Sequence, residues 1–296
     1  MSITLEEASK LSNDVLLIGV IETIIKESPI LQELPFIQIV GNGLTYNQEN
    51  TLPTVGWYHV GEEWQESAPT FTKVTAELKV VGGDADVDNF LKATRSNLQD
   101  LEAAVIELKA KALRHEFEKV FLNGDHTADA DQFDGLHTLL AGTDQEVTSG
   151  TNGATLSFAS LDKLIDKVLG GKPDMLLMSR RSRRKLQSLV RASGTMLETR
   201  PGKYLEQIQM YNGIPIAISD WVKDDYVVGS SSVCSAIFAF QMGEGAACGL
   251  SSPEMLQVER IGSLETKDAS RTRVKWYVSL ALFSSVKAAV LTGVTD

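Results

Sequence analysis

The sequence predicts an α+β fold in which an extended region and one long helix precede a unit of alternating helices and strands. From Thr72 to Val81, apolar residues alternate with polar ones, which is the period of a half-buried strand. Residues 97–123 carry apolar side chains at three- and four-residue spacing, which indicates a helix. Beyond residue 153, short apolar runs alternate with helical patterns, which is typical of a sheet covered by helices.

The N-terminal third predicts one short helix and then an extended ribbon. Ser12 or Asn13 can cap a helix over Val15–Lys26, and the Ser28-Pro29 pair ends it. The stretch from Phe36 to Thr72 is punctuated by glycine and proline, which favours extended and loop structure. A two-stranded ribbon is only marginally stable by itself in water, so we expect this one to lie on another surface.

The strand over Thr72–Val81 is expected to end at Gly82-Gly83, and the long helix follows. Ser96 with Gln99 fits a capping box, and Asn123-Gly124 closes the helix. A run of roughly 25 residues spans about 38 Å at 1.5 Å per residue. Such a helix beside a long ribbon predicts an elongated subunit.

The Gly-, Thr- and Ser-rich segment from Gly142 to Gly153 predicts a boundary between the two halves. After it we expect helices at 161–169 and 180–191, and strands at 175–178, 214–218, 233–240, 255–261 and 274–278.

The composition is that of an ordinary globular protein with an acidic balance. Apolar residues make up 43% and charged residues 23%, and the formal net charge is −11 with a pI near 4.9. Such a field repels polyanions, yet it permits a container that encloses DNA without gripping it. Cys234 and Cys248 cannot build a disulfide framework, and we expect both thiols to be buried and reduced. The apolar run Val15–Ile21 is too short to span a bilayer, so we expect no membrane segment.

The motifs that carry enzyme chemistry are absent or incomplete, so we expect no catalytic, cofactor-binding or metal site. Gly243, Gly245 and Gly249 miss the dinucleotide fingerprint by one residue, and Gly171-Lys172 lacks the Ser or Thr of a phosphate loop. No histidine pair has H-E-x-x-H spacing, and none follows residue 137 to complete a serine triad. The acidic residues beside His126 are either a solvated loop or a weak cation site, and we favour the solvated loop; they are Asp125, Asp129, Asp131 and Asp134.

Two charge patterns remain. Residues 180–185 hold five cations, which predict a solvated or inter-subunit face, with nucleic-acid contact as the alternative. Residues 27–72 contain six glutamates and no Lys, Arg or Asp. That run is either a solvated loop or an acidic arm that meets cations on another subunit.

The order of these parts resembles a known family. The ribbon carries Val55-Gly56-Trp57 and Glu62-Glu63-Trp64; the long helix ends in Phe121-Leu122-Asn123-Gly124-Asp125, and Phe133-Asp134-Gly135-Leu136 follows. Later segments are Asp174–Met178 before a helix, Tyr211-Asn212-Gly213-Ile214-Pro215-Ile216, and a closing strand around Arg271–Val278. Over nearly its whole length the chain is similar to the major capsid proteins of tailed bacteriophages, which share the Hong Kong 97-type fold.

The resemblance implies an N-terminal arm (1–36), an extended E-loop (37–80), a P-domain (81–152, with its spine helix at about 97–123), an axial A-domain (153–253) and a returning part of the P-domain (254–296). It also implies that copies form hexamers and pentamers of an icosahedral shell around double-stranded DNA, with a portal protein as partner. Only about 36 residues precede the E-loop, so we expect a separate scaffold protein or none, and a decoration protein is a further candidate partner. The expected place of the protein is the virion, assembled in the host cytoplasm.

Candidate contact residues lie in three regions. On the ribbon they are Trp57, Glu62, Glu63, Trp64 and Glu66; after the spine helix they are Asn123 and Asp125; and the candidate cations on the neighbour are Lys109, Lys111, Arg271, Arg273 and Lys275. Two other interpretations stay open: an encapsulin-like compartment shell on the same fold, and a soluble enzyme of unrecognised type.

Overall fold

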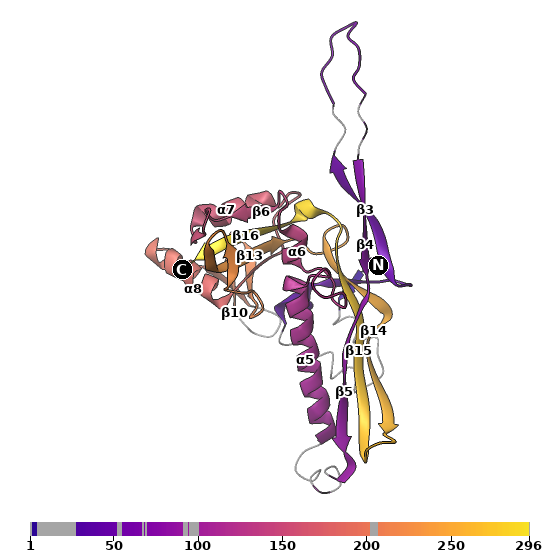
Figure 1. The fold of residues 1–296 in the computed structure, drawn as a ribbon. Helices are drawn as coiled ribbons and strands as arrows, with labels where there is room; N and C mark the ends of the chain where they lie inside the picture. The colour runs from indigo at the N-terminus through magenta and orange to yellow at the C-terminus, as the bar shows by residue number, and fades with distance from the viewer. Residues whose placement is uncertain are drawn as a thin grey trace.

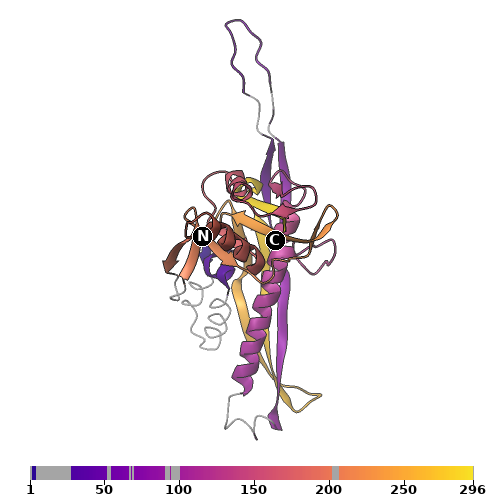
Figure 2. The same cartoon turned by 90° about the vertical axis from the view of Figure 1, so that its left-hand side faces the viewer.

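The computed structural model describes residues 2–4, 28–51, 55–66, 68, 70–90, 94, 101–201 and 207–295. Figure 1 shows an elongated molecule with three parts: a body of strands and short helices, a leg of long strands beside one long helix, and a thin ribbon at the opposite end from the leg. Figure 2 shows the long helix running along the leg beside strand β5 (Lys79–Asp88). The elongated subunit expected from the sequence is confirmed.

The leg is built on a sheet of five strands in the described part of the chain, in the order β1-β2-β14-β15-β5. The bounds are β1 Ser2–Thr4, β2 Pro35–Gln38, β14 Ala247–Ser263 and β15 Ala269–Leu282. β2 pairs in parallel with β14, and the other pairs of this sheet are antiparallel. Strands from both ends of the chain therefore share one sheet, and the ribbon departs from it.

The body is built on a second sheet, in the order β6-β16-β13-β8-β11-β10-β9, with β12 paired to β13 and β7 to β16. Its strands are β6 Glu146–Thr148, β7 Ala154–Thr155, β8 Met175–Met178, β9 Glu198–Pro201, β10 Gln207–Tyr211, β11 Ile214–Ile218, β12 Tyr226–Val228, β13 Ser231–Phe240 and β16 Ala288–Thr295. β8 is buried at every position, as its unbroken apolar sequence predicts.

The described helices are α3 Pro29–Glu33, α5 Leu101–Asn123, α6 Leu136–Leu140, α7 Phe158–Lys167, α8 Arg180–Ala192 and the 3₁₀ turn η1 Ser285–Lys287. Serine side chains satisfy the first amide groups of three of them, α3, α7 and α8. Ser157 and Ser160 form a reciprocal capping box at α7, and Ser179 accepts a hydrogen bond from the Ser182 amide at α8. A serine also caps α3, where Ser28 accepts from the Leu31 amide.

An aromatic cluster joins the long helix to the leg sheet. Trp276 of β15 is fully buried, with ring centroids 4.9 Å from Phe117 of α5 and 5.4 Å from Phe36 of β2. The Trp276 indole N–H donates to Ser251 Oγ at 3.1 Å, so its polar atom is satisfied inside the core. Phe36 thereby packs the N-terminal strand β2 against the long helix and β15.

Two expectations about strand ends were wrong. Gly82-Gly83 lies inside β5 rather than ending a strand, because both glycines pair in register with Lys275 and Val274 of β15. At Gly82 a Cβ would lie 2.5 Å from the Val274 carbonyl oxygen, so close packing against β15, not a turn, requires glycine there. The strand does break at Leu78, where the ribbon strand β4 (Thr70–Glu77) ends and β5 begins.

The segment 254–296, expected as the returning part of the P-domain, contributes strands to both large sheets. β14 already joins the leg sheet at Ala247, whereas β16 lies in the body sheet between β6 and β13. The segment 142–153, expected as a boundary, contains β6, which pairs with β16. The helix expected at Val15–Lys26 and the capping box at Ser96 and Gln99 lie outside the described residues.

Candidate functional site

The ribbon, residues 43–77, is a two-stranded sheet of its own. Its strands are β3 (Gly43–Thr51) and β4 (Thr70–Glu77), and they pair with each other but with neither large sheet. Near its base the ribbon touches the C-terminal end of β15: the Tyr46 ring lies 4.7 Å from Phe283, and Gln48 Nε2 donates to the Leu282 carbonyl at 2.6 Å. Figure 1 shows the rest projecting away from the molecule.

The ribbon tip, residues 55–66, presents apolar and acidic side chains together. Trp57 and Val60 are fully exposed, and Trp64 is largely exposed although it stacks on Tyr58 at 4.7 Å. Glu62 accepts a hydrogen bond from the His59 amide at 2.8 Å, which closes a turn at the tip. Grouped exposed apolar side chains of this kind are uncommon on soluble monomers, and tryptophan is enriched in protein interfaces.

The cations proposed to receive these glutamates are paired within their own subunit. Arg273 makes a bidentate ion pair with Asp84 (2.6 and 3.0 Å), and Arg271 makes one with Asp86 (2.6 and 2.7 Å). Hydrogen bonds from the arginines hold the pKa of both aspartates below the ordinary range. Lys275 pairs in the same way with Glu259 of β14 at 3.0 Å.

The resulting row across β5, β15 and β14 holds three cations and three anions, so its formal charge is zero. The helix cations are similar. Lys111 pairs with Glu107 at 3.1 Å, and Lys109 lies beside Gly83 and lowers the pKa of Asp84. Pairing of the ribbon glutamates with these cations on a neighbour remains a prediction, and it would require them to share existing partners.

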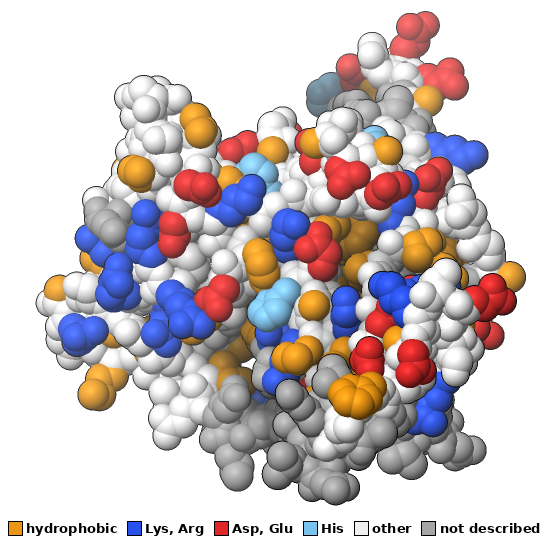
Figure 3. All heavy atoms as spheres, turned by 60° about the horizontal axis from the view of Figure 1, so that its bottom comes forward, with side chains coloured by type: hydrophobic (Ala, Val, Ile, Leu, Met, Phe, Trp, Pro, Cys, Tyr) orange, Lys and Arg blue, Asp and Glu red, His pale blue; other side chains and the backbone are white. Residues whose placement is uncertain are grey.

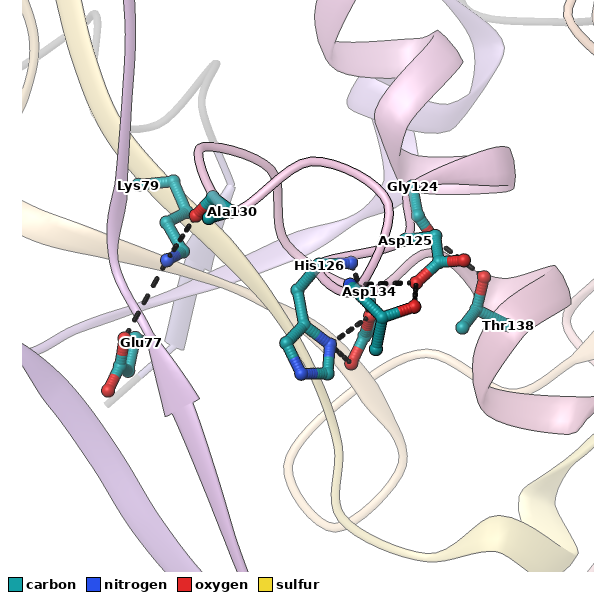
Figure 4. Close-up of polar contacts among 9 residues, drawn as sticks. Glu77, Lys79, Gly124, Asp125, His126, Ala130, Asp134 and Thr138 are labelled. Atoms are coloured by element: carbon teal, nitrogen blue, oxygen red, sulfur yellow. Dashed lines mark hydrogen bonds and ion pairs between the residues drawn. The ribbon is translucent and has the colours of Figure 1, made fainter.

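A closed loop, residues 124–135, follows the long helix and lies beside the ribbon base (Figure 4). The Gly135 amide donates to the Gly124 carbonyl at 2.9 Å, and His126 Nδ1 contacts both Asp134 oxygens at 2.7 and 2.8 Å. Lys79 donates to the Ala130 carbonyl at 2.9 Å, which ties the loop to the first residue of β5. At Gly135 a Cβ would lie 2.5 Å from the Val120 carbonyl oxygen, so the loop closes only with glycine there.

The two candidate contact residues of this region face different ways. Asn123 is half-buried and uses its amide inside the subunit, donating to the Trp221 carbonyl at 2.8 Å and accepting from the Tyr226 hydroxyl. Burial raises the pKa of Tyr226, which stacks on His137 at 4.6 Å. Asp125 is half-exposed, and its carboxylate accepts from the Thr127 amide and hydroxyl at 2.9 and 2.6 Å. Asn123 thus fastens the long helix to the body, whereas Asp125 shapes the loop.

The described residues hold one group with metal-like ligands, namely Asp125, His126 and Asp134. Asp134 is already paired with His126, and this hydrogen bond raises the pKa of the imidazole. Hydrogen bonds inside the loop therefore account for these side chains without an ion.

Neither thiol is placed for chemistry, since both cysteines are buried and burial raises the pKa of Cys248 to about 12. None of the helices in the described part of the chain combines the length and hydrophobicity that a bilayer span requires.

Sequence reasoning missed the acidic partners of the leg cations. Asp84 and Asp86 are spaced by two residues, as are Arg271, Arg273 and Lys275, so each set points to one face of a strand. Opposite charges at matching spacing were a readable signal for a cross-strand ladder. The charge ladder was not predicted because Gly82-Gly83 was expected to end the strand, which left Asp84 and Asp86 outside it.

Comparisons with known proteins agree with this architecture. Residues 15–240 match the model of the phage capsid family. The SrpI encapsulin of Synechococcus elongatus PCC 7942 has a similar structure at 18% identity, with 97% of this chain and 94% of that chain covered and a TM-score of 0.70. The capsid protein of an empty GTA particle matches at 16% identity, with 90% and 89% covered and a TM-score of 0.66.

A structure from Microbacterium phage Oxtober96 matches at 14% identity, with 91% of each chain covered and a TM-score of 0.66. No curated protein matches this chain. The Hong Kong 97-type fold expected from the order of the sequence motifs is confirmed. Because the family model covers residues 15–240 of 296, the chain belongs to the phage capsid family.

Proposed function

We propose that this chain is the major capsid subunit of a tailed bacteriophage. Its copies assemble into hexamers and pentamers, and these close an icosahedral shell around double-stranded DNA. The role is structural rather than enzymatic, and the protein resides in the virion after assembly in the host cytoplasm. A portal protein, a separate scaffold protein and a decoration protein are the further partners in this proposal.

The ribbon carries this proposal. It is an isolated strand pair, and such pairs are marginal without a supporting surface. Its tip exposes Trp57, Val60 and Trp64, whereas soluble monomers rarely present grouped apolar side chains to water. A neighbouring copy supplies the missing surface, and because every subunit both gives and receives a ribbon, the contact repeats around a ring.

Charge reversal tests the acidic part of the tip. Changing Glu62, Glu63 and Glu66 together to lysine should block assembly while the subunit stays folded, because all three carboxylates face solvent. The matched control is the same triple reversal at Asp144, Asp166 and Asp225, which are exposed and lie outside both the ribbon and the loop 124–135. Normal shells from the ribbon variant, measured by sedimentation velocity, would refute the role of these glutamates.

An encapsulin-like compartment is the second candidate, and the likeness to the SrpI encapsulin over 97% of this chain favours keeping it. The two functions differ in contents. Particles purified from the native host should hold nuclease-resistant DNA if the chain is a phage capsid subunit, and a packaged protein without DNA if it forms a compartment.

A further inference from the structure

A polar pocket lies where the long helix α5 meets α8 and the loop after β11. The cavity is about 430 Å³, which is within the range of ligand pockets. Arg114, His115 and Glu118 of α5 line one wall, Arg180 and Arg183 of α8 another, and residues 218–221 the third. Figure 3 shows the bottom of the molecule, where Lys and Arg side chains gather on the side to which Figure 1 assigns α8.

Apart from Arg114, which has partners of its own, three side-chain polar atoms around this pocket are buried without a hydrogen-bond partner among the described residues. They are two donors, Arg183 Nε and Trp221 Nε1, and one acceptor, Glu118 Oε1. Glu118 is only 5% exposed, so water reaches its carboxylate poorly. The hydroxyls of Ser28 and Ser219 lie close enough to this carboxylate to oppose the rise of its pKa, whereas Oε1 has no described partner within hydrogen-bond distance. Buried polar groups are nearly always satisfied in native proteins, and three on one cavity point to a ligand that supplies two acceptors and a donor.

The charge of the pocket favours an anionic ligand. Arg114, Arg180 and Arg183 contribute three positive charges against two negative ones from Glu118 and Asp220, which leaves a formal charge of +1. His115 is not counted as a charge in this sum, and its Nε2 lies 2.8 Å from Arg114 Nη2. Asp220 is already paired with Arg180 at 2.7 Å, whereas Arg183 has no acidic partner among the described residues.

Helix α8 continues the positively charged surface beyond the pocket. The helix contains six cations and no acidic residue. Of these, Arg184, Lys185 and Arg191 have no ion pair within the described part of the chain. A chain of net charge −11 therefore carries one strongly basic face beside a pocket with open donors.

Two features of the pocket favour a peptide over nucleic acid as its ligand: Glu118 Oε1 requires a hydrogen-bond donor, and the pocket is enclosed on three sides. A phosphodiester offers acceptors only, so Glu118 Oε1 would stay unpaired against it. The phosphates of duplex DNA also lie on a wide rod that cannot enter a pocket walled by buried atoms. A peptide offers a side-chain carboxylate for Arg183 and Trp221 and a backbone N–H for Glu118. We propose that this pocket binds an acidic side chain, with its adjoining backbone, from a partner protein's extended segment.

The test uses the purified chain in whatever assembly state it adopts, with three probes carrying the same fluorophore. These are a decapeptide of alternating Gly and Glu, the same peptide with Gln for Glu, and a 20-base-pair DNA duplex. Fluorescence anisotropy in 150 mM salt should show the Glu peptide binding at least tenfold more tightly than the Gln peptide. Failure of the Glu peptide to bind at millimolar concentration would overturn the proposal.

Two neighbouring arginines supply a matched pair of variants. Arg183→Met removes a donor that lines the pocket, whereas Arg184→Met removes the same charge from the exposed face of α8. The first should weaken Glu-peptide binding at least tenfold and the second less than threefold. Equal weakening by both, or equal affinity for the duplex, would show a diffuse basic face and overturn the proposal. If Arg183→Met fails to fold, Trp221→Phe decides, since it keeps the ring, removes the N–H donor and should still weaken binding at least threefold.

Discussion

Replacing Trp57 with alanine should separate assembly from folding. The side chain is fully exposed in the subunit, so its removal should change the free energy of unfolding by less than about 0.5 kcal/mol. Burying a tryptophan removes about 150–250 Å² from water, worth about 4–6 kcal/mol at 25 cal/mol per Å². Ordering of the ribbon opposes part of this gain, so a loss of about 2–4 kcal/mol per contact is expected, as for other interface hot spots.

That loss should raise the subunit concentration needed for assembly by about 30- to 700-fold, since each 1.4 kcal/mol is a factor of ten. Light scattering against subunit concentration measures this threshold, and circular dichroism confirms that the subunit is folded. Trp57→Phe keeps an aromatic ring at this position, so its assembly threshold should stay close to that of wild type. An unchanged threshold for Trp57→Ala would refute burial of the ribbon tip in a neighbour.

Three further predictions concern the core, the pocket and the covalent state of the shell. Phe36→Ala should destabilise the subunit by about 3–5 kcal/mol in denaturant unfolding, because it empties a fully buried site between Phe117 and Trp276; a loss below 1 kcal/mol would contradict this. Burial raises the pKa of Glu118 in the folded protein, so the ionised carboxylate lowers the free energy of unfolding at any pH above that pKa, and stability returns as the pH falls toward the pKa of the unfolded chain. Glu118→Gln should therefore have a higher melting temperature than wild type at pH 7.5, and the difference should shrink toward pH 4. A lower melting temperature of the variant at pH 7.5 would contradict this. Mature particles boiled in denaturant should run as one band near 32.3 kDa, because the only lysine between residues 41 and 74 is Lys73, at the ribbon base opposite Asn47; a ladder of larger species would reveal covalent cross-links.

Local patterns in the sequence predicted the elements whose own residues decide them. The apolar run Met175–Met178 and the segment Ile214–Ile218 are strands with the predicted bounds. The helix ends at Asn123 as predicted, since Gly124 follows and the loop from 124 to 135 closes at once. In each case the signal lies within a few residues of the feature.

Features that depend on a distant partner could not be predicted in this way. β5 runs through Gly82 and Gly83 because their partners in β15, Lys275 and Val274, lie far along the chain and hold them in the sheet. The chain passes from the leg sheet to the body sheet between β15 and β16, although nothing in Ala288–Thr295 distinguishes one sheet from the other. The ion pairs of Arg271 and Arg273 with the β5 aspartates also join residues far apart in the sequence. The prediction that these arginines receive the ribbon glutamates of a neighbour therefore did not take account of their partners in the same subunit.

The ribbon was predictable in outline, and its exposed tip was not. Glycine and proline marked the extended segment, but exposure of Trp57 and Val60 follows from how far the strands carry them from the body. The pocket between α5 and α8 had no signal in the sequence beyond the cations at 180–185. Its orphaned atoms come from three segments that only the fold brings together.

Electron cryomicroscopy of particles assembled from the recombinant chain tests the shell proposal most directly. The expected map shows closed shells of hexamers and pentamers in which each ribbon, residues 43–77, lies across a neighbouring subunit and Trp57 is buried there. A monodisperse monomer at high concentration, with or without scaffold protein, or particles whose ribbons project freely into solvent, would contradict it.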